Sequence, residues 1–290
     1  MLTRPVGLDD GVLRAALASH WNVDAVSLKY LPVGFGSHHW DARDQRGERW
    51  FVTVDVLPDR RWRVDESNAD VFARLHGALV TAMEIDRPFV VAPVAPPVRF
   101  GDDFCVALYP FVAGETRRDL DDIRALLAEL HAVPVEQTHA RRDDLTIQFR
   151  DALEDALEAP GDDTGPYAVR TAAFVLGAER QLRGRLAAYD RRIEEVASLP
   201  FVVTHGEPHG WNTMLTADGW KLIDWDTALL APRERDLWHL GDTGTSALDF
   251  FRLRWDLSDT ALFVQRLRAP HTGTADDAKT FRKLEGLLGR

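Results

Sequence analysis

The pattern of apolar and polar residues is mostly strand-like in the first part of the chain, up to about residue 113, and mostly helical after it. Residues 9–20 have the spacing of a short amphipathic helix, with Asp9 or Asp10 as its N-cap. Next come three alternating runs separated by polar turns, at 25–33, 34–44 and 49–57. This pattern predicts a helix followed by a three-strand meander.

A second helix and two more strands are predicted before residue 113. Residues 66–85 carry apolar side chains at helical spacing, at Val71, Leu75, Leu79 and Met83. Two strand-like runs follow at 94–100 and 104–112, joined by a Gly-Asp-Asp turn. The first run contains two prolines, which favours an edge strand because proline cannot donate to a ladder.

Helical spacing dominates the chain after Gly114. The runs expected to be helical are 119–133, 147–158, 167–199 and the C-terminal stretches. One β-rich segment, 201–226, interrupts them. We therefore expect an α+β protein with a β-rich N-terminal lobe over 1–110 and a larger, mainly helical C-terminal lobe over 111–290.

Composition narrows the possible partners and the compartment. The formal net charge of −11 argues against nonspecific nucleic-acid binding and is compatible with a cationic small substrate. No run approaches about 18 uncharged apolar residues, and no signal peptide is evident, so neither a membrane partner nor secretion is expected. The single cysteine, Cys105, suits a reducing cytoplasm.

The residues with the clearest chemistry lie in the β-rich segment. The sequence HGEPHGWN places Glu207 five residues before Asn212, and Asp224 follows twelve residues later within LIDWD. A kinase catalytic loop spaces its acid and its metal-binding asparagine in this way, with a metal-binding aspartate on the next hairpin. The Asp218-Gly219 turn should bring Asn212 and Asp224 together, where their oxygens can hold Mg²⁺.

These motifs resemble the aminoglycoside phosphotransferase family of the protein-kinase-like superfamily. That family carries HGDxHxxN, then IDWxxA and a later DL pair, and this chain reads HGEPHGWN, IDWDTALLAP and RERDL. The form looks most like the branch that includes spectinomycin phosphotransferase. The resemblance implies a two-lobed kinase-like fold, Asn212 and Asp224 as Mg²⁺ ligands, and Glu207 in the catalytic position. It also implies Asp236 as a structural acid and Asp226 as an assistant at the metal or acceptor site.

The resemblance also assigns a nucleotide site to the N-terminal lobe. Gly34, Phe35, Gly36 and Ser37 would form the loop that covers the phosphates, since glycine lets backbone N–H groups approach them. A plain hairpin turn is the alternative reading of this GxG sequence. The Pro110 carbonyl and the Val112 N–H would bind the adenine of ATP.

The chain departs from the family pattern at two positions. Glu207 stands where the family has aspartate, and Thr53 stands at the strand position of the phosphate-binding lysine. An arginine at 60, 61 or 63 is a candidate substitute for that lysine. For the lysine's glutamate partner, Glu66 is the nearest candidate.

Three functions remain open from the sequence. The first is an ATP- and Mg²⁺-dependent O-phosphotransferase acting on an aminoglycoside, an aminocyclitol or another hydroxylated amine, with antibiotic resistance as one setting. The second is a nucleotide-binding pseudokinase or ligand-binding protein, motivated by Glu207 and the missing lysine. The third is a metal hydrolase using His205 and His209, although a structural role for these histidines is favoured.

Overall fold

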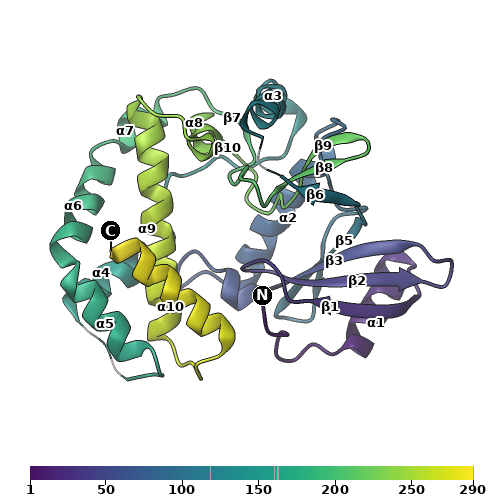
Figure 1. Cartoon of the computed structure of the whole chain (residues 1–290), viewed down its shortest axis with the longest axis horizontal. Helices are drawn as coiled ribbons and strands as arrows, with labels where there is room; N and C mark the ends of the chain where they lie inside the picture. The colour runs from purple at the N-terminus through teal and green to yellow at the C-terminus, as the bar shows by residue number, and fades with distance from the viewer. Residues whose placement is uncertain (118, 160, 162, 290) are drawn as a thin grey trace. The chain divides into compact units, whose positions relative to one another are not determined.

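The computed structural model describes residues 1–117, 119–159, 161 and 163–289, and Figure 1 labels their helices and strands. These residues belong to two compact units. The first unit contains Met1–Arg61, Ser67–Asp143 and Pro200–Asp242. The second contains Trp62–Glu66, Asp144–Leu199 and Thr243–Arg290. The lobe boundary expected at residue 110 falls inside the first unit and stays a prediction.

A five-stranded antiparallel sheet forms the N-terminal part of the first unit, in the order β1-β2-β3-β5-β4. Its strands are β1 (Ala25–Leu31), β2 (His38–Asp44), β3 (Arg49–Val56), β4 (Val98–Phe100) and β5 (Phe104–Pro110). The predicted meander is confirmed by β1, β2 and β3. Strand β4 lies at the edge as expected, although it begins at Val98, after the two prolines of the predicted run.

Two helices cover opposite faces of this sheet, because side chains alternate between the two faces along each strand. Helix α1 (Asp10–Trp21) begins at the N-cap Asp9, which accepts the Val12 N–H at 2.8 Å, and packs against Trp40, Val52 and Val54. Helix α2 (Asn68–Glu84) begins with a Ser67–Asp70 capping box.

Helix α2 packs its apolar side against the other face of the sheet. Val71 and Leu75 meet the buried Cys105, and Leu79 joins a larger cluster with Ala107. Met83 was expected on this face but is exposed, and Ala82 is buried in its place.

The remaining elements of the first unit include the strands of the β-rich segment predicted at 201–226. They are η1 (Leu57–Arg60), β6 (Gly114–Thr116), α3 (Leu120–His131), η2 (Val135–Gln137), β7 (Val202–Thr204), β8 (Thr213–Thr216), β9 (Gly219–Leu222), β10 (Leu229–Ala231), α8 (Glu234–Leu237) and η3 (Trp238–Leu240). Strands β6, β8 and β9 form one sheet, and β7 pairs with β10. The sequence did not predict β6.

The second unit is helical in the part of the chain that the structure describes. Its helices are α4 (Arg150–Glu158), α5 (Ala168–Gly177), α6 (Glu179–Asp190), α7 (Ile193–Ala197), α9 (Ser246–Arg268) and α10 (Ala275–Leu288). The run at 167–199 is thus three helices, with a first break at Ala178. Helix α9 is buried at ten positions along its length, and its Phe250 stacks on Tyr189 of α6 with ring centroids 4.5 Å apart.

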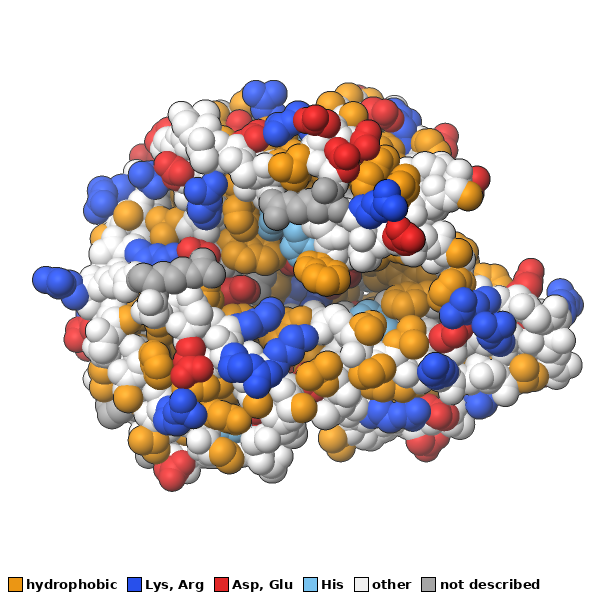
Figure 2. Space-filling view, in the orientation of Figure 1, with side chains coloured by type: hydrophobic (Ala, Val, Ile, Leu, Met, Phe, Trp, Pro, Cys, Tyr) orange, Lys and Arg blue, Asp and Glu red, His pale blue; other side chains and the backbone are white. Residues whose placement is uncertain are grey.

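The predicted α+β class is confirmed by this antiparallel sheet and the mainly helical remainder. Among the described residues, no helix is both long and apolar enough to cross a membrane. On the face drawn in Figure 2, acidic and basic side chains are interspersed, and a few Lys and Arg side chains gather below the centre of the view.

Candidate functional site

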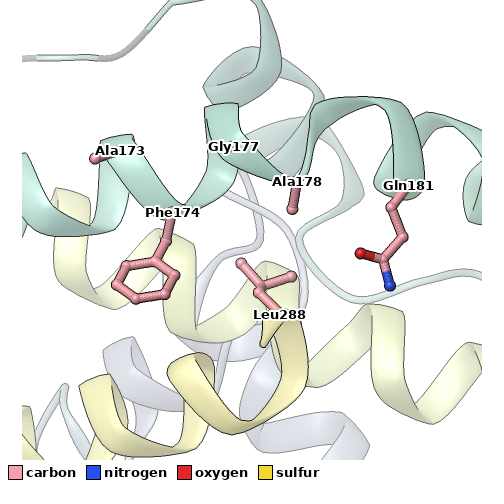
Figure 3. A pocket seen from close by; sticks show the side chains of 6 residues that line it. All are labelled: Ala173, Phe174, Gly177, Ala178, Gln181 and Leu288. Atoms are coloured by element: carbon pink, nitrogen blue, oxygen red, sulfur yellow. The ribbon is translucent and has the colours of Figure 1, made fainter. Parts of the chain in front are cut away.

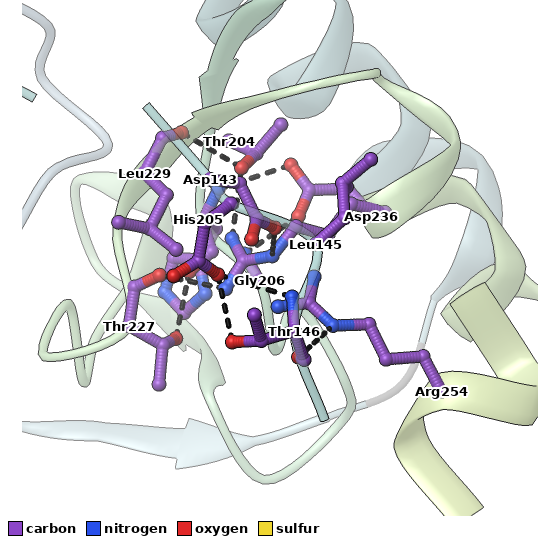
Figure 4. A network of polar contacts seen from close by, with 12 residues as sticks. Asp143, Leu145, Thr146, Thr204, His205, Gly206, Thr227, Leu229, Asp236 and Arg254 are labelled. Atoms are coloured by element: carbon purple, nitrogen blue, oxygen red, sulfur yellow. Dashed lines mark hydrogen bonds and ion pairs between the residues drawn. The ribbon is translucent and has the colours of Figure 1, made fainter. Parts of the chain in front are cut away.

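A loop between β7 and β8 carries the HGEPHGWN motif, and Asp236 of α8 fixes its start (Figure 4). The Asp236 carboxylate accepts the backbone N–H of His205 at 3.0 Å and that of Gly206 at 2.6 Å. It also contacts His131 Nε2 at 2.9 Å. Burial opposes the charged form, but His131 and Arg235 outweigh it and hold the pKa of Asp236 below its usual range. Asp236 is therefore an ionised anchor of the loop.

His205 joins this loop to the segment that follows β9. Its Nε2–H donates to the Ile223 carbonyl at 2.9 Å, and its Nδ1 accepts the Glu207 N–H at 3.3 Å. Both ring nitrogens are thus used within the protein, and burial lowers the pKa of His205 to about 4. The imidazole is neutral at pH 7, and its contacts support a structural role.

Arg235 braces the same loop, although the sequence analysis did not identify it. Its guanidinium donates to Thr204 Oγ1 and to the Thr227 carbonyl, each at 2.8 Å. Thr227 in turn donates through Oγ1 to the His205 carbonyl at 2.8 Å. Gly206 has φ +97°, and a Cβ there would lie 2.6 Å from Arg235 Cζ, so only glycine fits this position without a shift. The only sequence signal for Arg235 was its place in RERDL.

Glu207 projects from the anchored loop beside two histidines. Its Oε2 lies 3.6 Å from His209 Nε2, and the ring centroids of His209 and His239 are 5.9 Å apart. Burial would raise the pKa of Glu207, but His209, His239 and Arg60 outweigh it and lower that pKa. Glu207 is therefore a carboxylate at neutral pH, able to accept a hydrogen bond from a hydroxyl.

The hairpin of β8 and β9 brings Asn212 beside the segment that contains Asp224, as the sequence predicted. The Ile223 N–H donates to the Asn212 carbonyl at 3.0 Å, so Asp224 is the next residue along from this contact. Asn212 Nδ2 donates to the Glu207 carbonyl at 3.1 Å, which leaves its amide oxygen as the atom that can face a cation.

Asp224 is held in an uncommon backbone conformation and in an acidic environment. Its φ is +67°, in the left-handed region where aspartate and asparagine are tolerated better than most residues. Solvent reaches the side chain, yet partial burial and the charges of Asp226 and Glu207 raise its pKa well above the usual range. A cation bound beside this carboxylate would favour its ionised form.

Asp226 and Asp55 extend this acidic group and share one guanidinium. Arg60 Nε lies 3.2 Å from Asp55 Oδ1, and Arg60 Nη2 contacts Asp226 Oδ2. Burial raises the pKa of Asp226 to about 6 despite Arg60, because Asp55 and Glu207 oppose a further negative charge. Four carboxylates act on the charge of Arg60, those of Asp226, Asp55, Asp224 and Glu207. One guanidinium cannot neutralise all four.

This donor set fits Mg²⁺ at Asn212 and Asp224. Carboxylate and amide oxygens are hard ligands, and Mg²⁺ characteristically uses few protein ligands and keeps several waters. Within the described residues, no group of three or more His, Cys, Asp or Glu side chains is arranged to hold a metal. A two-ligand site completed by phosphate and water therefore fits these residues better than an all-protein cage.

The glycine-containing loop, residues 34–37, leads into β2 and lies against Arg60. Ser37 Oγ donates to Asp55 Oδ1 at 2.7 Å, and a Cβ on Gly36, whose φ is +105°, would overlap Arg60 Nη1. This loop therefore lies against the same charged group as Asp226. Phe35 is part of the same loop.

The other expected nucleotide contacts lie where β5 ends. Pro110 is its last residue and pairs with Trp50 of β3, and Val112 follows two residues later. Their contacts with adenine remain a prediction.

The other residues that the sequence offered for the phosphate site have partners outside the acidic group. The Glu66 carboxylate accepts the Trp62 N–H at 2.5 Å, within one short loop. Arg61 donates to Asn68 Oδ1 at 3.0 Å, and the exposed Arg63 lies 3.7 Å from Asp65. Asp55, the observed partner of Arg60, was missed because its position on β3 gave no motif signal.

A separate hollow in the second unit lacks the chemistry of an active site (Figure 3). It is lined by Ala173, Phe174, Gly177, Ala178, Gln181 and Leu288. None of these side chains is an acid, a base or a nucleophile. The group around Glu207 and Asp224 is therefore the better candidate.

Comparison with known proteins identifies relatives along most of the chain. The family model described as "Phosphotransferase enzyme family" matches residues 36–274. Protein StrN of Streptomyces griseus is 32% identical, covering 71% of this chain and 73% of that protein.

Solved structures share the fold at low sequence identity. Macrolide 2'-phosphotransferase type I has a TM-score of 0.54 at 17% identity, covering 97% of this chain and 98% of that one. A thermostable mutant of aminoglycoside phosphotransferase APH(4)-Ia, in a ternary complex with AMP-PNP and hygromycin B, has a TM-score of 0.58 at 12% identity, covering 96% and 98%. Ethanolamine kinase of Plasmodium vivax has a TM-score of 0.56 at 9% identity, covering 99% and 96%. The expected kinase-like fold is confirmed.

Proposed function

The chain belongs to the phosphotransferase enzyme family, and from that premise we propose that it transfers phosphate from ATP to a hydroxyl group of a small amine-bearing acceptor. Family membership makes the chain a phosphotransferase. The nucleotide, the metal, the acceptor and the roles of individual residues belong to the proposal.

The observation that carries the proposal is the acidic group beside the glycine-containing loop. Asp224, Asp226, Asp55 and Glu207 all act on Arg60, which also lies against Gly36. An excess of carboxylates favours divalent cations, and a glycine loop favours close approach of phosphate oxygens. The two features adjoin, as binding of a metal–nucleotide complex requires.

Glu207 would accept the hydrogen bond of the acceptor hydroxyl and direct its oxygen at the terminal phosphate. Its lowered pKa makes it a weak base, which suits an orienting role. Phosphoryl transfer passes through a loose transition state, so positioning and charge stabilisation matter more than early removal of the proton. The backbone contacts of Asp236 with His205 and Gly206 keep this carboxylate's loop in place.

Asn212 and Asp224 would hold Mg²⁺, which when bound neutralises charge on the phosphate oxygens. The loop of Gly34, Phe35, Gly36 and Ser37 would direct backbone N–H groups at the phosphates. The Pro110 carbonyl and the Val112 N–H would bind the adenine base.

The acceptor class is inferred from charge and exposure. The chain carries a formal charge of −11, which favours a cationic acceptor. Trp211, one residue before Asn212, is 78% exposed and offers an aromatic face for a sugar ring or an ammonium group. An aminoglycoside or an aminocyclitol satisfies both features, and the motif form favours a spectinomycin-like acceptor. Antibiotic resistance would then be the setting of the reaction.

The test is a phosphotransfer assay with ATP and Mg²⁺ over a panel of amino-sugar and aminocyclitol antibiotics and simple amino alcohols. Product formation should require Mg²⁺ and be lost in the Asp224→Asn variant, which keeps the residue's shape. If no acceptor is modified and calorimetry detects no Mg²⁺-ATP binding, the proposal is refuted. Nucleotide binding without transfer to any acceptor would select the pseudokinase instead.

A further inference from the structure

Arg60 contacts two carboxylates of the acidic group, and its guanidinium is largely enclosed. It ends η1, the first element after β3, and its side chain is only 18% exposed. Enclosing a guanidinium is unfavourable unless carboxylates surround it. Here the carboxylates of Asp55 and Asp226 do so.

Arg60 also lies against the glycine-containing loop. Its Nη1 occupies the space that a Gly36 side chain would need. Ser37, next in that loop, donates to the same Asp55 carboxylate that contacts Arg60. The loop, Asp55 and the guanidinium thus form one connected group.

The backbone at Arg60 is held from the neighbouring helix. Arg74 of α2 is buried, and its Nη2 donates to the Arg60 carbonyl at 2.5 Å. At the other end of η1, the Leu57 N–H donates to the Asp103 carbonyl at 2.7 Å. These contacts fix where the guanidinium can reach, so its position is not that of a freely moving surface arginine.

The neighbouring arginines have other partners. Arg61 donates to Asn68 at the start of α2, and Arg63 is 59% exposed and lies near Asp65. Thr53 shares its strand face with Asp55 but carries no charge. Among the three arginines considered for the phosphates, the geometry singles out Arg60.

Resting on the function proposed above, we infer that Arg60 is the phosphate-binding cation of the nucleotide site and that Asp55 positions it. The guanidinium contacts Asp226 in the structure and exchanges that contact for phosphate oxygens when the nucleotide binds. Its planar fork suits two oxygens at once. Arg60 and Asp55 then form a cation–carboxylate pair within one strand and the turn that follows it.

The test measures the affinity of adenosine, AMP, ADP and ATP, each with Mg²⁺, for the full chain and its variants by calorimetry. Arg60→Met should weaken ATP binding by about 10- to 100-fold, the range of one charged hydrogen bond, and leave adenosine affinity unchanged. Asp55→Asn should weaken ATP binding by a smaller factor, about 3- to 10-fold, because it disturbs only the positioning of Arg60. Arg63→Met, which removes the same charge three residues away, should bind all four ligands as the wild type does.

Removing Arg60 leaves several carboxylates together and can prevent folding, so Arg60→Lys is measured in parallel. Lysine keeps the charge but loses the fork, and the loss of affinity should still grow from adenosine to ATP. In the folded variants, equal losses for adenosine and ATP, or no loss at all, overturn the inference. A wild-type chain that binds none of the four ligands refutes the proposed function itself, whereas normal wild-type binding with unaffected Arg60 variants refutes only the role of Arg60.

Discussion

Replacing Gly206 with alanine tests whether Arg235 holds the catalytic loop in shape. Gly206 has φ +97°, and a Cβ there would lie 2.6 Å from Arg235 Cζ and Nη1. Gly219, in the β8–β9 hairpin, also has φ +97°, but no atom lies within 4 Å of the position that a Cβ would take there. Gly219→Ala is therefore a matched control with the same backbone strain and no collision.

The expected free-energy changes differ because of this collision. Both variants place an L-residue in left-handed backbone, which costs about 1–2 kcal/mol. Gly206→Ala must also displace the Arg235 guanidinium, which donates hydrogen bonds to Thr204 and Thr227 and lies 3.7 Å from Asp143 Oδ2. Bonds to charged groups contribute about 1.5–3 kcal/mol each, so the additional loss is about 3–6 kcal/mol if both break. Gly206→Ala should therefore destabilise the chain by several kcal/mol more than Gly219→Ala.

The measurement combines denaturation midpoints with turnover of an identified acceptor. Because Glu207 follows Gly206 directly, a shift of about 1 Å in this loop should lower kcat by about 10²-fold. Gly219→Ala should leave kcat near the wild-type value. Equal destabilisation by the two variants, with equal kcat, would refute the bracing role of Arg235.

Three further predictions concern the charged groups of the site. Asp224→Asn should abolish Mg²⁺-dependent transfer. The variant without ligand should melt at the same or a higher temperature than the wild type, because the raised pKa of Asp224 means that its charge opposes folding at pH 7. A lower melting temperature would contradict this. Glu207→Gln should lower kcat by about 10²- to 10⁴-fold with little change in nucleotide affinity, and a fully active variant would exclude Glu207 as the orienting group. His205 has a pKa of about 4 when folded and 6.5 as its ordinary value, so its contribution to stability is complete above pH 6.5 and falls by up to about 3 kcal/mol as the pH drops towards 4. Urea midpoints from pH 7 to 4 should fall less steeply for His205→Asn than for the wild type, and parallel slopes would contradict this assignment.

Features encoded by short stretches of sequence could be predicted. The Asp9 cap, the meander and the β8–β9 hairpin depend on residues near one another in the chain, and the structure contains all three. The hairpin also explains why the adjacency of Asn212 and Asp224 was predictable, since a tight turn at Gly219 fixes which residues return to face each other.

Contacts between distant parts of the chain could not be predicted in the same way. Arg60 and Asp226 are 166 residues apart, and His131 and Asp236 are 105 apart. No local pattern specifies such pairs, so the sequence left three arginines open and missed Asp55. Met83 was wrongly predicted to be buried for a similar reason. Helical spacing identifies the apolar face of a helix but not the residue at which that face leaves the core.

The residues that hold the catalytic loop have hydrogen-bond partners, whereas the carboxylates at the centre of the site lack enough positive charge around them. Asp236 and Arg235 each have several polar partners, and both ring nitrogens of His205 are hydrogen-bonded. Asp224 and Asp226, in contrast, have raised pKa values, because burial disfavours their charged forms and the neighbouring carboxylates add to this effect. A fold that lacked a ligand for this centre would gain stability by losing one of these acids. Their presence inside a rigid frame is therefore best explained by binding of positive charge, and Mg²⁺ with a nucleotide should stabilise the first unit by the linkage of binding to folding.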